Sequence, residues 1–204
     1  ATKNQPKEML PIIDKPIIQY LVEECVNSGI EDVILVTRFG QSSLENHFDS
    51  NFELEQQLKN NGKVDLLEKV QQVSQMANIV YVRQRKHFPY GNGTPLLCVK
   101  DLIDKDEAFV YMFGDDLVRP PTGGGPATQQ LMRVWRKSPT AVVLAAQEVA
   151  AEEVKRYGIV KLKPGTDNEV ESIVEKPEPE AAPSRLAQFG RFILNHQIID
   201  ILSQ

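Results

Sequence analysis

Four short runs of apolar, largely β-branched residues constrain the fold of this 204-residue chain more than any other feature. The runs are DVILVT (32–37), NIVYVRQ (78–84), AFVYMF (108–113) and AVVLAA (141–146). Continuous runs of this kind are typical of strands that are buried on both faces of a parallel sheet. Their alternation with helical segments predicts right-handed crossovers and a doubly wound α/β sheet, in which ligands gather outside the carboxyl ends of the strands.

Helical patterns fill the intervals between these runs. Residues 16–28 carry an apolar stripe at helical spacing, with a proline in the first turn and a glycine just past the end. Further helical segments are predicted over 41–76, 94–103 and 126–138. From residue 157 onward, shorter and more alternating strands, broken by proline-rich turns at 177–183, predict a small additional β layer beside the main sheet. A final helix is expected to begin near Asn195.

The composition indicates a hydrophobic core under an acidic surface. Hydrophobic residues make up 41% of the chain, the net charge is −5 and the pI is near 5.3. Nucleic acids and anionic membranes select clustered positive charge, so this balance argues against both as partners, although a local basic patch for a small anion fits. No window has the roughly 18 apolar residues of a membrane span, no signal segment opens the chain, and the two cysteines lack zinc-site spacing. We therefore predict a cytoplasmic protein with buried free thiols.

A carboxylate at a strand end is the first candidate for chemistry. The run AFVYMF leads into Gly114, Asp115 and Asp116. Asp115 follows a glycine that lets a ligand come close, so its carboxylate is well placed to hold a hard divalent cation such as Mg²⁺. The alternative is a turn aspartate that caps a loop, and the segment by itself leaves both open.

A second candidate follows the strand at 78–84, which leads through RKHFPY into GNGTP. Gln84 offers one acceptor and two donors, which suits the edge of a nucleobase, and Gly91 and Gly93 permit the backbone to approach a planar ring. The alternative is a flexible surface loop with a glycine turn. A Walker phosphate loop is excluded because no GK[ST] sequence occurs.

Two charged segments complete the candidates. Glu175 and Lys176 come just before the proline of the segment EVESIVEKP, and strand alternation places them on opposite faces unless the backbone twists or bulges at Pro177. Lys7 lies between Pro6 and the segment MLP, and the prolines restrain the backbone around its ammonium in a way that suits a phosphate. For all three side chains, an ordinary solvated charge is the alternative.

In their order and spacing, these segments resemble the bacterial UTP:glucose-1-phosphate uridylyltransferases, a family of the sugar-nucleotidyltransferase superfamily. The opening ATKNQPKEMLPIIDKPIIQYLVEE resembles the segment that follows the glycine-rich loop of that family. Further matches come in the same order over nearly the whole chain: GIEDVILVT, ENHFD with FELE, VRQ with a downstream GxG, GDD, YGIV, VEKP, APS and GRFIL. The combination is far more specific than any one motif.

The resemblance implies a Rossmann-like nucleotidyltransferase fold with a mixed sheet and a small additional β layer. It also implies a reaction in which a phosphate oxygen of glucose-1-phosphate attacks the α-phosphorus of UTP, giving UDP-glucose and pyrophosphate, with Mg²⁺ as the cofactor. Such a transfer needs positioning and charge neutralisation more than covalent help from protein. The absence of an evident nucleophile is consistent with it.

Site residues are carried over position by position from the resemblance. Lys7 is the expected phosphate-contacting lysine, Lys176 the lysine on the sugar phosphate, and Asp115 the metal-binding aspartate. The remaining assignments are nucleotide-binding Gln84, Gly91 and Gly93, and sugar-binding Gly158 and Glu175.

Some of the family pattern is not matched. The family's first strand and its GxGTR loop are expected before Ala1, and a second metal-binding aspartate is expected after Gln204. Residues 1–204 are therefore interpreted as a single nucleotidyltransferase domain without these segments, and such a chain is expected to turn over little or no substrate. Asn92 and Pro95 stand where small apolar residues are expected in the base loop.

Two rival functions stay open from the sequence. A glucose-1-phosphate thymidylyltransferase of the same superfamily would use dTTP, although PKEML and the long helical insertion at 41–76 resemble the uridylyl branch. A truncated, non-catalytic module would bind UDP-glucose without releasing pyrophosphate. The family commonly forms dimers and tetramers, so a homo-oligomer is expected.

Overall fold

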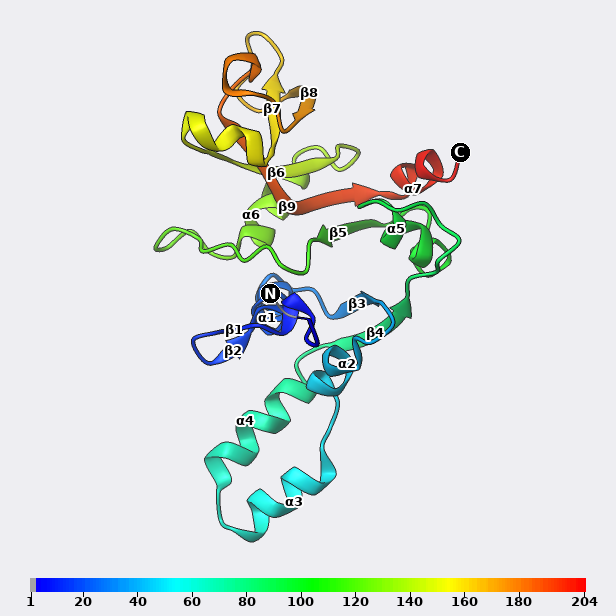
Figure 1. Ribbon diagram of the computed structural model, residues 1–204, viewed down its shortest axis with the longest axis vertical. Coiled ribbons are helices and arrows are strands. Elements are labelled where there is room, and N and C mark those ends of the chain that lie inside the picture. The colour runs from blue at the N-terminus through cyan, green and yellow to red at the C-terminus, as the bar shows by residue number, and fades with distance from the viewer. Residues whose placement is uncertain (1–2) are drawn as a thin grey trace.

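Strands and helices alternate as the sequence predicts in the computed structural model, which describes residues 3–204 (Figure 1). The strands are β1 (Pro11–Ile12), β2 (Lys15–Pro16), β3 (Asp32–Thr37), β4 (Asn78–Arg83), β5 (Ala108–Met112), β6 (Val143–Glu148), β7 (Gly158–Leu162), β8 (Val170–Glu175) and β9 (Leu186–Asn195). The α-helices are α1 (Ile17–Asn27), α2 (Ser42–Phe48), α3 (Phe52–Asn60), α4 (Val64–Ser74), α5 (Thr94–Val99), α6 (Ala127–Trp135) and α7 (His196–Leu202). Short 3-10 helices are η1 (Lys7–Met9), η2 (Lys100–Leu102), η3 (Ala151–Arg156) and η4 (Pro179–Ala181).

The strands pair in a mixed pattern, and here the expectation of a parallel sheet needs correction. Only β3 and β4 pair in parallel, over Asp32–Thr37 and Asn78–Arg83. The other five form one sheet in which β9 pairs antiparallel with β5, β6 and β7, and β7 pairs antiparallel with β8. Because both β5 and β6 are antiparallel to β9, they run in the same direction, but β9 separates them. An apolar run reports burial and carries no information on the direction of its neighbour, so the sequence could not show this insertion.

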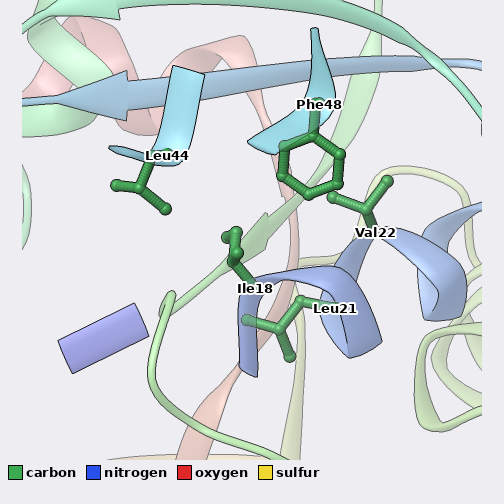
Figure 2. Close-up of a cluster of buried hydrophobic side chains, with 5 residues drawn as sticks. All are labelled: Ile18, Leu21, Val22, Leu44 and Phe48. Atoms are coloured by element: carbon green, nitrogen blue, oxygen red, sulfur yellow. The ribbon is translucent and has the colours of Figure 1, made fainter. Parts of the chain in front are cut away.

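The first hydrophobic core lies between α1, α2 and one face of the β3–β4 pair. Ile18, Leu21 and Val22 of α1 pack against Leu44 and Phe48 of α2, as Figure 2 shows. This is the apolar stripe that predicted the helix, and burying each of the larger side chains contributes roughly 1.5 to 3 kcal/mol. The predicted helix over 16–28 is thus confirmed, to within its first and last residues.

Strands β3 and β4 are less buried than their composition predicts. Val33, Leu35 and Ile79 pack on the core of α1 and α2, and Tyr81 on the same face donates its O–H to the Glu45 carbonyl of α2, whereas Val80 on the other face is 47% exposed. Within residues 3–204, no hydrogen-bonded ladder joins this pair to the five-stranded sheet. Helices cover one face only, so these strands alternate between inside and outside despite their continuous apolar sequence.

The predicted helical segment at 41–76 is three helices. Residues 49–51 interrupt the helix between α2 and α3. Asn51 caps the start of α3, because its Oδ1 accepts a hydrogen bond from the Leu54 N–H at 3.0 Å. A second break contains Gly62, whose φ of 66° is one that glycine adopts without strain. Helices α3 and α4 extend away from the sheets as an antiparallel arm (Figure 1).

The two cysteines are free, as predicted, but only one is buried. Cys25 of α1 is buried and Cys98 of α5 is half-buried. Burial raises the pKa of the Cys25 thiol to about 12, so it stays protonated and packs as a small apolar group. Over the part of the chain that the structure describes, no helix has both the length and the apolarity to cross a membrane.

Strand β9 meets the end of β5 at a position where a side chain would not fit. The Phe113 N–H donates to the Gly190 carbonyl at 3.0 Å. A Cβ placed on Gly190 would lie within 2.6 Å of three atoms of the Phe113 side chain. The glycine therefore lets β9 approach the residue that leads into the Gly114–Asp116 turn.

We predict that Gly190→Ala lowers the free energy of unfolding by roughly 1 to 3 kcal/mol, because the methyl group forces Phe113 or β9 to move. The midpoint of urea denaturation measures it. Gly91→Ala is the matched control, since nothing lies within 4 Å of a Cβ there. Its free energy of unfolding is expected to stay within about 0.5 kcal/mol of that of the parent protein. Equal midpoints for the two variants would contradict the packing argument.

Candidate functional site

Lys7 and Asp115 lie side by side although 108 residues separate them. Lys7 opens η1, which begins after Pro6 and is anchored by Met9 against the first hydrophobic core. Asp115 lies in the turn after β5. The Lys7 Nζ donates to Asp115 Oδ2 at 2.5 Å, and the two side chains are 53% and 37% exposed. The structure thus brings together the residues that the sequence proposed for a phosphate and for a metal.

Glu8, which the sequence analysis did not single out, lies next to this pair. Its side chain packs against Gly114, where a Cβ would come within 3.1 Å of Glu8 Cγ. The Glu8 Oε2 is buried and has no hydrogen-bond partner. A buried carboxylate oxygen without a partner is costly, and a cation or a donor would satisfy it.

The chemistry of these side chains fits Mg²⁺. Carboxylate oxygens of Asp115 and Glu8 are hard ligands, and Mg²⁺ commonly takes one or two carboxylates and fills its remaining positions with water and substrate phosphates. Among residues 3–204 no group of three or more His, Cys, Asp or Glu side chains is arranged to enclose a metal. An open site completed by substrate suits this donor set better than a closed structural one.

Gly158, Glu175 and Lys176 form a second group, where β7 pairs with β8. Gly158 stands opposite Glu175 in the β7–β8 register. A Cβ on Gly158 would lie 3.1 Å from Glu175 Oε2 and 2.8 Å from Nε2 of Gln188 on β9. Gln188 therefore belongs to this group, and its sequence context in AQFG gave no signal for it.

The backbone at Lys176 resolves the question of opposite faces. Lys176 has a φ of 46°, in the left-handed region that residues other than glycine seldom adopt. Its N–H still donates to the Tyr157 carbonyl at 3.0 Å, and Pro177 is buried directly after it. The alternation breaks there, so the Lys176 Nζ lies 3.6 Å from Glu175 Oε1. Such backbone conformations concentrate at functional sites.

The third group surrounds the loop after β4. The Gln84 N–H donates to the Thr37 carbonyl at 2.8 Å, so Gln84 continues the β3–β4 ladder by one residue and is half-buried. Gly91 is exposed, with nothing within 4 Å of its Cβ direction. The Cβ direction of Gly93 instead meets the Leu202 side chain of α7 at 2.9 Å. Packing of α7 is therefore a reason for glycine at 93 that is separate from ligand access.

Tyr111 of β5 holds this loop and was missed because a strand tyrosine is usually a core residue. Its O–H donates to the Asn92 carbonyl at 2.6 Å. The ring lies 5.7 Å from Phe113 and 6.1 Å from Phe192, measured between centroids. Burial raises the pKa of the Tyr111 phenol to about 12, so the hydroxyl remains a donor throughout the neutral range. The strand that leads into Asp115 thus also fixes the GNG loop.

A buried ion pair connects α1 with β9 behind the Asp115 turn. The Arg191 guanidinium lies against the Glu24 carboxylate, with Nη2 to Oε2 at 3.0 Å and Nε to Oε1 at 3.2 Å. The two side chains are 0% and 9% exposed. Arginine is almost never fully buried without a partner, so the arginine within the apolar run GRFIL was a signal that could have been used.

The predicted site residues thus fall into three groups, and no hydrogen bond or ion pair joins one group to another within the described chain. Gly158, Glu175 and Lys176 lie with β7 and β8 at one end of the five-stranded sheet, whereas the loop after β4 lies near α5 (Figure 1). Asp115 lies in the turn after β5, and β5 and β8 are at opposite ends of the strand order β5-β9-β7-β8. A ligand that touched all three groups would therefore have to be extended.

Known proteins resemble this chain over its whole length. It is 46% identical over 204 residues to UTP–glucose-1-phosphate uridylyltransferase YngB of Bacillus subtilis (strain 168), a match that covers 99% of this chain and 66% of that protein. The chain therefore spans about two thirds of the length of this relative.

Solved structures agree with the sequence comparison. A UTP-bound UGPase from Acinetobacter baumannii shares 35% identity with a TM-score of 0.91, covering 100% of this chain and 72% of that one. A UDP-glucose pyrophosphorylase complexed with UDP-glucose shares 35% identity with a TM-score of 0.82, covering 100% and 73%. These matches confirm the predicted nucleotidyltransferase fold.

The family model described as nucleotidyl transferase matches residues 1–204. Together with the mixed sheet and the carboxylate of Asp115 after β5, this match identifies the chain as a member of the nucleotidyl transferase family, related to the bacterial UTP–glucose-1-phosphate uridylyltransferases.

Proposed function

We propose that this chain serves a uridylyltransferase that converts UTP and glucose-1-phosphate into UDP-glucose and pyrophosphate, with Mg²⁺ as the cofactor. The contact between Lys7 and Asp115 carries the proposal, because it joins the two residues to which the sequence assigned a phosphate and a metal. The relatives named above for UTP and UDP-glucose support the same substrates.

In this proposal Asp115, Glu8 and Lys7 serve to neutralise the negative charge of the substrate phosphates. Asp115, with Glu8 beside it, would hold Mg²⁺, and the bound cation would supply positive charge next to the substrate oxygens. The Lys7 ammonium neutralises a phosphate from its own side, and its contact with Asp115 keeps it close to the reacting groups. Charges fixed before substrate arrives need little rearrangement as the transition state forms.

The group on β7 and β8 serves the sugar phosphate. Glu175 accepts hydrogen bonds from sugar hydroxyls, and the absence of a side chain at Gly158 leaves the space in which Glu175 and Gln188 lie beside the strand. Lys176 places its ammonium on the glucose-1-phosphate oxygens, where it orients the attacking phosphate toward the α-phosphorus of UTP. The left-handed backbone at Lys176 supports this role, because it turns the ammonium to the same side as Glu175.

The loop after β4 serves the base. Gln84 reads the uracil edge, and Gly91 and Gly93 bring backbone groups to the ring plane. A thymidylyltransferase is the nearest rival, since uracil and thymine differ by one methyl group that this loop must exclude or accept. A UDP-glucose-binding module without turnover is the rival from another class.

We further propose that residues 1–204 belong to one nucleotidyltransferase domain that works in the cytoplasm as part of a homo-oligomer. The free cysteines support a reducing compartment.

A first prediction from the proposed function is that the protein, given glucose-1-phosphate and Mg²⁺, releases pyrophosphate from UTP faster than from dTTP. A coupled pyrophosphate assay with each nucleotide in parallel measures it. A preference for dTTP would favour the thymidylyltransferase. Saturable UDP-glucose binding with no pyrophosphate from either nucleotide would favour the binding module.

A second prediction from the proposed function is that Asp115→Ala and Lys176→Ala each lower kcat by about a hundredfold or more. Lys176→Ala removes a cation from the reacting phosphates, and Asp115→Ala removes the carboxylate that would hold Mg²⁺ beside them. Both side chains are at least one third exposed, so the fold should persist. Lys155→Ala, an exposed lysine on η3, is the control and should keep full activity. Loss of cooperative unfolding in either site variant would show a structural role instead.

The third prediction is that Tyr111→Phe raises KM for UTP by about three- to tenfold while kcat changes little. The variant keeps the ring and removes only the hydrogen bond to Asn92, a loss of about 1 kcal/mol. Steady-state kinetics with varied UTP measures the effect. Tyr90→Phe is the matched control, because Tyr90 lies in the same loop and is fully exposed. An unchanged KM in Tyr111→Phe would remove the role given to this hydroxyl.

A further inference from the structure

Arg191 makes more contacts than a structural ion pair requires. Besides the two bonds to Glu24, its Nη1 donates to the Gly190 carbonyl at 2.9 Å and its Nη2 to the Asp116 carbonyl at 2.7 Å. One rigid guanidinium therefore joins α1, β9 and the turn that contains Asp115. A lysine has no planar fork with which to make these contacts together.

Glu24 is itself fixed from the opposite side. Its Oε1 accepts from the Thr128 N–H at 3.0 Å and from the Thr128 Oγ1 at 2.6 Å, in the first turn of α6. The carboxylate is thus held by a helix terminus and by the guanidinium at once, and neither charge can swing away to water. Burying such a pair costs desolvation energy, so stability alone is a weak reason to have it.

The turn around Asp115 is held on both of its flanks. The Gly190 N–H donates to Asp116 Oδ2 at 2.8 Å, and the Phe113 N–H donates to the Gly190 carbonyl at 3.0 Å. Arg191 adds the bond to the Asp116 carbonyl, directly after Asp115. Within residues 3–204, the Asp115 carboxylate has a hydrogen bond only with Lys7. Its place is therefore set by the backbone on either side, which β9 holds.

We propose that Arg191, locked by Glu24, is a positioning residue that holds Asp115 in the orientation needed to bind a divalent cation. The inference rests on the proposed function through the metal role of Asp115 and adds the part of the fold that makes this role possible. Groups that orient a metal ligand without touching the metal commonly change metal affinity by about 10- to 100-fold when they are removed.

Titration of the protein with Mn²⁺ alone, followed by the EPR signal of free Mn²⁺, tests the proposal without relying on turnover. The main variant is the double substitution Glu24→Met with Arg191→Met, which removes both buried charges together and keeps the side-chain volume, so that folding is preserved. Its Mn²⁺ affinity is expected to fall by about tenfold or more. Arg191→Lys is the second variant, in case the double variant does not fold, and a drop in the same direction is expected.

Two controls separate positioning from general destabilisation and from failure of the proposed function. Thr128→Ala removes a bond to the same carboxylate and leaves the contacts of Arg191 with the turn, so it should lower the denaturation midpoint while Mn²⁺ affinity stays within about twofold. Asp115→Asn should remove the Mn²⁺ site. If Asp115→Asn weakens binding and the Arg191 variants do not, the positioning role is wrong. If Asp115→Asn also has no effect, the metal role of Asp115 fails, and the inference fails with it.

Discussion

The antiparallel insertion of β9 between β5 and β6 is the constraint on which most of this structure depends. It makes one sheet of strands that come from distant parts of the sequence. Near the middle of β9, Gly190 gives the space that the Phe113 side chain fills, and Arg191 binds Glu24 of α1. Without this strand, β5 and β6 would lack a hydrogen-bonded neighbour within the described chain, and the Asp115 turn would lose its supports.

The site was more predictable from the sequence than the topology that builds it. The phosphate and metal roles of Lys7 and Asp115 could be proposed because the order and spacing of the motifs resemble a known family, and the structure sets the two side chains in contact. The direction of β9 could not be proposed, because an apolar strand has the same pattern in either direction. Arg191 was recoverable in principle as a charge within an apolar run, but its partner Glu24 looked like an ordinary helix residue. Such long-range pairs are decided by tertiary packing.

At Gly93 and Lys176 the structure adds local information that the sequence pattern did not contain. For Gly93, the sequence suggested room for a base, and the structure adds a packing reason in Leu202. For Lys176, the sequence posed a conflict between strand alternation and a shared site with Glu175, and the left-handed backbone removes it. Backbone conformations of this kind follow from the surrounding contacts, so a local pattern does not reveal them. The functional roles assigned to all of the predicted site residues stay predictions.

The distance in sequence between Glu24 and Arg191 has a consequence for how the protein is made. The two residues are 167 positions apart, so a ribosome completes α1, β3, β4 and β5 long before the partner of Glu24 exists. During that interval the carboxylate has no buried cation beside it, and the turn after β5 has no strand to rest on. Contacts of such long range close late and slow the folding of a domain. The turn that contains Asp115 is therefore expected to be among the last parts of this protein to become ordered, only after β9 has left the ribosome.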